Sequence, residues 1–193
     1  NSWGGSGGRL TYNALLEQQR AAGILPVMSA GNNGGQCGTM GSPGDNLTAY
    51  SVGATDVNDN IAGFSSRGPD PFTSWMGLYG VDPDVSAPGV NIRSSVPGGG
   101  YESGWSGPSM ASPHVSGLVA LILSAEPDLI GRVDEIEELI LRTAVPRTST
   151  QQCGGVPGSS IPNNPFGWGR VDAMAAVGMI WHAGTLAGTV TDA

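Results

Sequence analysis

One serine stands where a tight turn meets a long apolar run. The segment Gly107-Pro108-Ser109 leads into Leu118-Val119-Ala120-Leu121-Ile122-Leu123. Glycine permits a sharp bend and proline is favoured at the first position of a helix, so we expect Ser109 in the first turn of a helix. Its hydroxyl would lie beside unpaired N–H groups and the positive end of the helix dipole, which suits an acyl-transfer nucleophile. An N-cap serine before a buried helix is the alternative that this segment leaves open.

Composition limits the classes of function. The 193 residues suit one domain with its own core, since 39% are apolar and 12% are charged. A net charge of −8 without a basic cluster argues against nucleic-acid binding. We expect no membrane span, because no apolar run reaches the ~18 residues that a span needs. The chain contains no lysine, which excludes a serine–lysine catalytic pair.

The two cysteines and the chain start bear on the cellular setting. Cys37 and Cys153 both lie in loops rich in glycine and serine. We expect a disulfide between them in an exported protein, and two unrelated buried thiols are the alternative. The chain begins at Asn1 without a methionine or a signal peptide, so we expect it to be a piece of a longer protein.

Helical and extended patterns alternate along the chain, which is typical of an α/β domain. The helix at 109–125 is apolar nearly all round, so we expect it to be central and buried. Turn residues at 97–100 indicate a hairpin between two short strands. The tail from residue 182 has alternating small and β-favouring residues, which predicts a linker and the first strand of a further β domain. The other helices are expected at 10–22, 133–144 and 172–181, and the strands or extended pieces at 24–30, 49–55, 61–66, 83–87, 91–96 and 101–105.

Three motifs follow one another in a specific order. They are Ser29-Ala30-Gly31-Asn32-Asn33-Gly34, then Phe64-Ser65-Ser66-Arg67-Gly68-Pro69 with Ser86-Ala87-Pro88-Gly89, then Ser109-Met110-Ala111-Ser112-Pro113-His114-Val115. Together they resemble the subtilisin-like serine proteases, and the sequences of 1–5 and 87–97 look closest to those of bacillopeptidase F-type members. The resemblance implies an α/β fold, a mainly parallel sheet with helices on both faces, whose N-terminal strands are missing here. Residues 1–181 would be the C-terminal portion of such a catalytic domain, and 182–193 the linker and following strand.

The resemblance also implies roles for single residues. Ser109 matches the nucleophile, and Asn32 matches the side chain that stabilises the oxyanion together with the Ser109 N–H. Ala30, Gly31 and Asn33 match the floor and rim of the pocket for the residue before the scissile bond. The remaining matches form an extended segment along which a substrate peptide pairs as an added strand, with its aromatic residue narrowing a more distant apolar subsite: Ser2, Trp3, Gly4 and Gly5. Plain turn residues are the alternative for the two glycines.

Two departures from the family pattern affect the chemistry. Pro108 stands where the family usually has threonine, so we expect a weakened oxyanion hole. The family's catalytic Asp and His precede the asparagine loop, and neither motif occurs in this chain. His114 lies about 140° round the helix from Ser109 and is expected to be structural, and His182 is expected to be solvated or packed. We therefore expect no peptide hydrolysis by this chain alone. We expect it to pair with the N-terminal part of the same domain or with itself, or to aggregate through its open sheet edge.

Other readings of the same residues differ in function. A sedolisin-type peptidase is disfavoured because it typically has Asp at the position of Asn32. A catalytically degenerate binding or structural module is favoured by Pro108 and by the absent partners, but Ser109 and Asn32 are both intact. We expect export, polypeptide substrates and no cofactor. A weak calcium site, of a kind that relatives in the family carry in loops, is a further hypothesis for Gly44, Asn46, Ala49 and Asp84.

Overall fold

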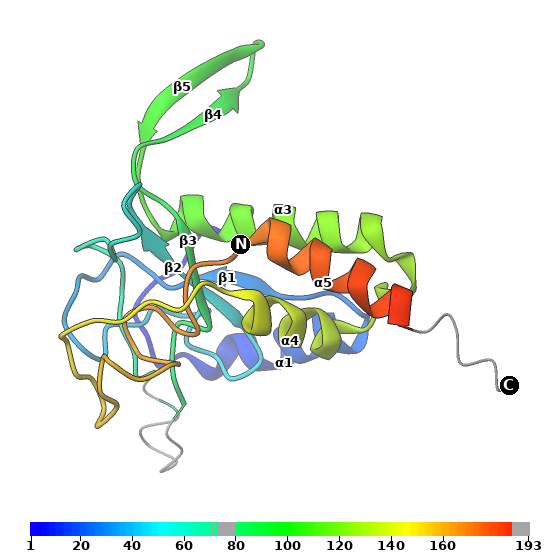
Figure 1. Ribbon diagram of the computed structural model, residues 1–193. Helices are drawn as coiled ribbons and strands as arrows, with labels where there is room; N and C mark the ends of the chain where they lie inside the picture. Colours follow the sequence, from blue (N-terminus) through cyan, green and yellow to red (C-terminus); the bar gives the residue numbers. More distant parts are fainter. Residues whose placement is uncertain (71, 73–79, 187–193) are drawn as a thin grey trace, which may run out of the picture.

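The computed structural model describes residues 1–70, 72 and 80–186, with side-chain surroundings up to residue 180 (Figure 1). Strands and helices alternate along much of the chain, which confirms the expected α/β class. In chain order the elements are η1 (Leu10–Tyr12), α1 (Asn13–Ala21), β1 (Val27–Ser29), β2 (Tyr50–Thr55), β3 (Val85–Pro88), β4 (Ile92–Val96), β5 (Gly100–Trp105), α3 (Pro108–Ala125), η2 (Pro127–Leu129), α4 (Val133–Thr143) and α5 (Ala173–Leu186).

A three-stranded parallel sheet in the order β1-β2-β3 forms the centre of the described residues. Val27 pairs with Tyr50, and Val52 pairs with Val85, so the three strands run in register across the core. All six residues of β2 are buried, as expected for the middle strand of a covered parallel sheet. The predicted extended piece at 61–66 is wrong beyond Ile61, because only Ile61 bridges to β2 and the residues after it form turns.

Helix α3 packs across β1, β2 and β3. Its core-facing residues recur at helical spacing and are Pro108, Ala111, Ser112, Val115, Leu118 and Ile122. The helix is central, as expected, but it is buried only on the side that faces the sheet, since Leu121 is 54% exposed. By length and composition alone α3 is also long and apolar enough to cross a membrane, which is weak evidence for a span. Core helices of soluble proteins meet the same criterion.

The predicted hairpin is confirmed as an antiparallel pair of β4 and β5. Every residue of β5 is exposed, and Figure 1 shows the hairpin standing away from the rest of the molecule. Arg93 lies over the ring of Tyr101, 4.9 Å from its centroid, in a cross-strand cation–π contact. The base of the hairpin leads directly into the turn that begins α3.

The flanking helices occur where the pattern indicated, with shifted ends. Helix α4 buries Val133, Ile136 and Ile140, which recur at helical spacing. Strand β1 begins only after Pro26, which has no N–H to give to a sheet. Helix α5 continues to Leu186, so the first part of the predicted linker is helical, and 187–193 lie outside the described residues. The predicted disulfide is confirmed between Cys37 and Cys153, 116 residues apart.

Candidate active site

The turn before α3 is fixed against the end of the parallel sheet. Gly107 has φ 153° and ψ 161°, a conformation open almost only to glycine, and Pro108 follows at the first helical position. The Gly107 N–H donates to the carbonyl of Gly89, just after β3, over 2.7 Å. Gly89 must also be glycine, because a Cβ there would lie 2.6 Å from the Ala54 Cβ. Ser109 is thereby placed at the carboxyl edge of the sheet, where α/β proteins gather ligands.

The structure brings the predicted residues Ser109 and Ser2 together. The Ser109 hydroxyl donates to the carbonyl oxygen of Ser2 over 2.8 Å. The Ser2 hydroxyl donates in return to the carbonyl oxygen of Ser109 over 2.8 Å. Asn1, next to Ser2, is held beside β1, because the Ser29 N–H donates to its carbonyl. The N-terminal segment and the first turn of α3 therefore hold each other in place, although 107 residues separate them.

Asn32 also lies near this turn. A Cβ at Gly107 would stand 3.3 Å from the Asn32 Oδ1 and 3.9 Å from its Nδ2. Asn32 follows β1 closely and is exposed. Its amide therefore lies next to Gly107, and its role in stabilising an oxyanion remains a prediction.

The predicted pocket residue Ala30 and the predicted peptide-pairing residue Gly5 both contact the loop segment Gly41–Ser42. The Gly5 N–H donates to the carbonyl of Ser42 over 2.9 Å. The Gly41 N–H donates to the carbonyl of Ala30 over 2.9 Å, and a Cβ at Gly41 would lie 2.8 Å from the Gly5 carbonyl oxygen. The sequence reasoning missed Gly41 and Ser42. In a glycine-rich loop, the sequence alone does not distinguish a glycine needed for a close backbone contact from a glycine in an ordinary turn.

The predicted pocket residues Asn33 and Gly31 are held by hydrogen bonds to Ser66 and Thr39. The Asn33 N–H donates to the Ser66 hydroxyl over 3.1 Å, and the Asn33 Nδ2 donates to the Thr39 carbonyl over 3.0 Å. The Ser66 N–H donates to the Gly31 carbonyl over 3.0 Å. Ser66 and Thr39 were also missed, since neither residue contacts the predicted nucleophile.

Trp3 and Gly4 belong to the exposed N-terminal segment. Trp3 is 56% exposed and packs edge-on against Tyr12, with the ring centroids 5.6 Å apart. A Cβ at Gly4 would lie 2.9 Å from the Ser42 carbonyl oxygen, so the backbone runs close to Ser42 there. The role of Trp3 in narrowing an apolar subsite remains a prediction.

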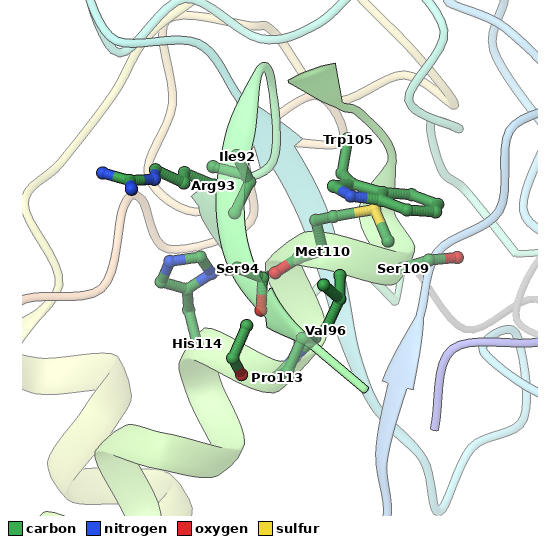
Figure 2. Close-up of a pocket in the computed structure, with 10 residues that line it drawn as sticks. Ile92, Arg93, Ser94, Val96, Trp105, Ser109, Met110, Pro113 and His114 are labelled. Atoms are coloured by element: carbon green, nitrogen blue, oxygen red, sulfur yellow. Dashed lines mark hydrogen bonds between the residues drawn. The ribbon is translucent and has the colours of Figure 1, made fainter. Parts of the chain in front are cut away.

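The histidine side chain that the structure describes, His114, does not bond to Ser109. The His114 ring makes its hydrogen bond through Nδ1 with the Met110 carbonyl oxygen at 2.8 Å. Figure 2 shows this ring and the Ser109 hydroxyl on opposite sides of the start of α3. His182 lies in α5, beyond the residues whose side chains are described. Within the described part of the chain, Ser109 therefore has a carbonyl as its partner and no imidazole.

The strongly shifted carboxyl groups lie away from this site, at the start of β3. Burial raises the pKa of Asp84 to about 6, although the Ser51 N–H and hydroxyl both donate to it. Burial, and then the neighbouring charge of Asp84, raises the pKa of Asp82 well above its usual range. Of the hypothesised calcium ligands, Asp84 thus already binds Ser51, and the Asn46 carbonyl accepts the Ala49 N–H. The calcium site remains a prediction, to be tested by comparing the melting temperature in calcium and in chelator.

Comparison with known proteins identifies the family of this chain. The model of the subtilase family matches residues 1–169, so the chain belongs to the subtilase family. It is 43% identical over 185 residues to bacillopeptidase F of Bacillus subtilis (strain 168), which covers 93% of this chain and 12% of that protein. It is 41% identical over 126 residues to alkaline elastase YaB of Bacillus sp. (strain YaB), covering 65% of this chain and 29% of the relative. The serine protease AprX of Bacillus subtilis is 39% identical over 147 residues, with coverages of 65% and 31%. The chain thus spans less than a third of the length of each of these three relatives.

Proposed function

We propose that this chain carries the nucleophile and the oxyanion-binding groups of a serine endopeptidase. The single observation behind the proposal is that Ser109, Ser2 and Asn32, from three distant segments, surround one turn at the edge of the sheet. The Ser109 oxygen attacks the carbonyl carbon before the scissile bond. The Asn32 amide and the Ser109 N–H then stabilise the negative oxygen of the tetrahedral intermediate.

The proton of the Ser109 hydroxyl requires a base from outside the described residues. We place that base, and the carboxylate that orients it, on the N-terminal part of the same catalytic domain. An open groove of about 430 Å³ lies beside Ser109 and would receive this part (Figure 2). Its apolar lining is Ile92, Val96, Trp105, Met110 and Pro113. The base takes the hydroxyl proton and later gives it to the leaving amine, so the chain alone does not turn over.

The substrate is a polypeptide in an extended conformation. Residues 2–4 are exposed and lie next to Ser109, so their backbone can pair with a peptide as an added strand. The substrate residue before the scissile bond places its side chain between segment Gly4–Gly5 and segment Ala30–Gly31, with Asn33 at the rim of this pocket. We further propose export of the protein, which is supported by the disulfide between Cys37 and Cys153.

A degenerate binding module is the competing function, and Pro108 favours it. Proline at this position has neither an N–H nor a hydroxyl to offer an oxyanion. Such a module would keep the peptide-binding edge at 2–4 and lack a reactive Ser109. The two functions differ in one observable, which is the nucleophilicity of the Ser109 oxygen.

A fluorophosphonate probe measures that nucleophilicity directly. We expect the natural full-length protein to be labelled at Ser109, and Ser109→Ala to abolish labelling. Ser116→Ala is the matched control, because Ser116 lies on the same helix and only donates to the Ser112 carbonyl. The chain 1–193 by itself should label far more slowly, since it lacks the proposed base. Well-folded full-length protein that remains unlabelled would refute the peptidase and leave the binding module.

A further inference from the structure

The loop that carries Asn32 is held by a second, distant loop. We call residues 31–39 the Asn32 loop and residues 149–156 the clamp loop. Segment 64–68 supports the Asn32 loop from one side: the Thr39 N–H donates to the Arg67 carbonyl, and the Arg67 N–H donates to the Thr39 hydroxyl, each over 2.9 Å. These bonds join two segments that are close in the sequence. The clamp loop reaches the same place from more than 110 residues further along the chain.

Arg67 is a buried cation without a carboxylate partner in the described residues. It is 4% exposed, and burial lowers the pKa of its guanidinium to about 10. Its NH1 and NH2 groups donate to the carbonyls of Ser65 and Ala62, and its Nε donates to the Oε1 of Gln151 over 3.3 Å. An interior guanidinium needs acceptors for all its N–H groups. Gln151 is the acceptor that the clamp loop contributes.

Gln151 also bonds to the Asn32 loop with the other end of its amide. The Nε2 of Gln151 donates to the Gly35 carbonyl over 2.6 Å. Two residues further along each loop, the disulfide joins Cys37 to Cys153. The clamp loop therefore holds the Asn32 loop at two successive points, once by a hydrogen bond and once by a covalent bond. Figure 1 shows the yellow and orange loops on the same side of the molecule as the blue and cyan ones.

We propose that Gln151 and the Cys37–Cys153 disulfide are positioning elements that set the placement of the Asn32 loop, and through it the rim of the pocket for the residue before the scissile bond. This inference rests on the proposed peptidase function. Among the described residues, the Gln151 side chain bonds to Gly35 and Arg67 and not to Ser109, so it acts through these two residues. Its loss leaves the Gly35 carbonyl and the Arg67 Nε without these partners, so the loop between Asn33 and Thr39 shifts. The clamp loop thereby influences which side chains the enzyme accepts.

The first test compares substrates that differ only in the residue before the scissile bond. Peptide p-nitroanilides with alanine or phenylalanine there are cleaved by the natural full-length protein and by Gln151→Ala. We expect the ratio of the two kcat/KM values to change about two- to tenfold, the worth of one hydrogen bond. Gln152→Ala is the matched control, because it removes the same amide from the adjacent, exposed position. The double variant Cys37→Ser and Cys153→Ser should change the ratio in the same direction as Gln151→Ala.

The second test does not depend on catalysis. Hydrogen exchange of the Asn33, Gly34 and Thr39 amides should be faster in Gln151→Ala and unchanged in Gln152→Ala. Gln151→Glu keeps an acceptor for Arg67 but loses the donor to Gly35, so its exchange rates should lie between those of Gln151→Ala and Gln152→Ala. It replaces Gln151→Ala if that variant does not fold.

The outcomes separate the two proposals. Faster exchange with an unchanged substrate ratio refutes the role in specificity, and unchanged exchange refutes the clamp altogether. If the unaltered full-length protein cleaves neither substrate, the peptidase proposal fails and the clamp is judged by exchange alone.

Discussion

The two sides of α3 offer a sharp test of how the helix is buried. Ile122 is fully buried against the sheet, and its neighbour Leu121, about 100° round the helix axis, is 54% exposed. Leu121 falls on the same helical face as Pro113, His114 and Gly117, because these positions are spaced by three, four, seven and eight residues. This face continues from the groove beside Ser109. The perturbation is truncation of each residue to alanine.

The expected costs follow from burial. Ile122→Ala removes three buried carbons, worth about 2.4 kcal/mol of transfer free energy, and a cavity term brings the total to about 2–5 kcal/mol. Leu121→Ala removes carbons that already have about half their surface in water and leaves no closed cavity. Its cost in the chain 1–193 should therefore be about 1 kcal/mol.

Guanidinium unfolding followed by circular dichroism measures both values as differences in the free energy of unfolding. In the natural full-length protein, the proposed N-terminal part covers this face, and Leu121→Ala should then cost about 2–5 kcal/mol as well. Equal costs for both variants in the chain 1–193 would contradict the one-sided burial of α3. A Leu121→Ala cost that stays at its low value in the full-length protein would refute the proposed covering of the groove.

Three further predictions concern the turn beside Ser109. Asn32→Ala should lower kcat of the full-length protein by ~10²–10³ with little change in KM, because the donor acts on the transition state; an unchanged kcat argues against its role. Pro108→Thr should raise kcat several-fold while remaining below the ~10² of a full oxyanion donor, and equal activity would show that proline weakens nothing. Gly89→Ala should destabilise the fold by about 1–3 kcal/mol in thermal unfolding, since its Cβ would lie 2.6 Å from that of Ala54. Gly63→Ala, with no atom within 4 Å of its Cβ, is the control and should be nearly neutral.

Local pattern was enough to predict the elements that carry the site. The Gly107-Pro108-Ser109 turn, the apolar run behind it and the loop after β1 follow from backbone preferences and hydrophobic spacing, which act over a few residues. The same rules predicted the β4–β5 hairpin and the helix at 133–144. They failed at 61–66, where an apolar and small-residue pattern forms turns. They also failed at the end of α5, where the pattern beyond 181 suggested a linker and the helix continues to Leu186.

The sequence by itself determined the identity of the chemical groups: a serine at a helix start, an asparagine after a strand, two cysteines and no lysine. Only the tertiary structure decided which of them meet. Three contacts join residues that are far apart in the sequence, which local pattern cannot predict. They are the hydrogen bond from Ser109 to Ser2, the close approach of Gly41 to Gly5, and the hydrogen bond from Gln151 to Gly35. The open face of α3 is decided at the same level. The sequence of an apolar helix does not show whether one side or both sides are covered, because burial depends on which other segments pack against it.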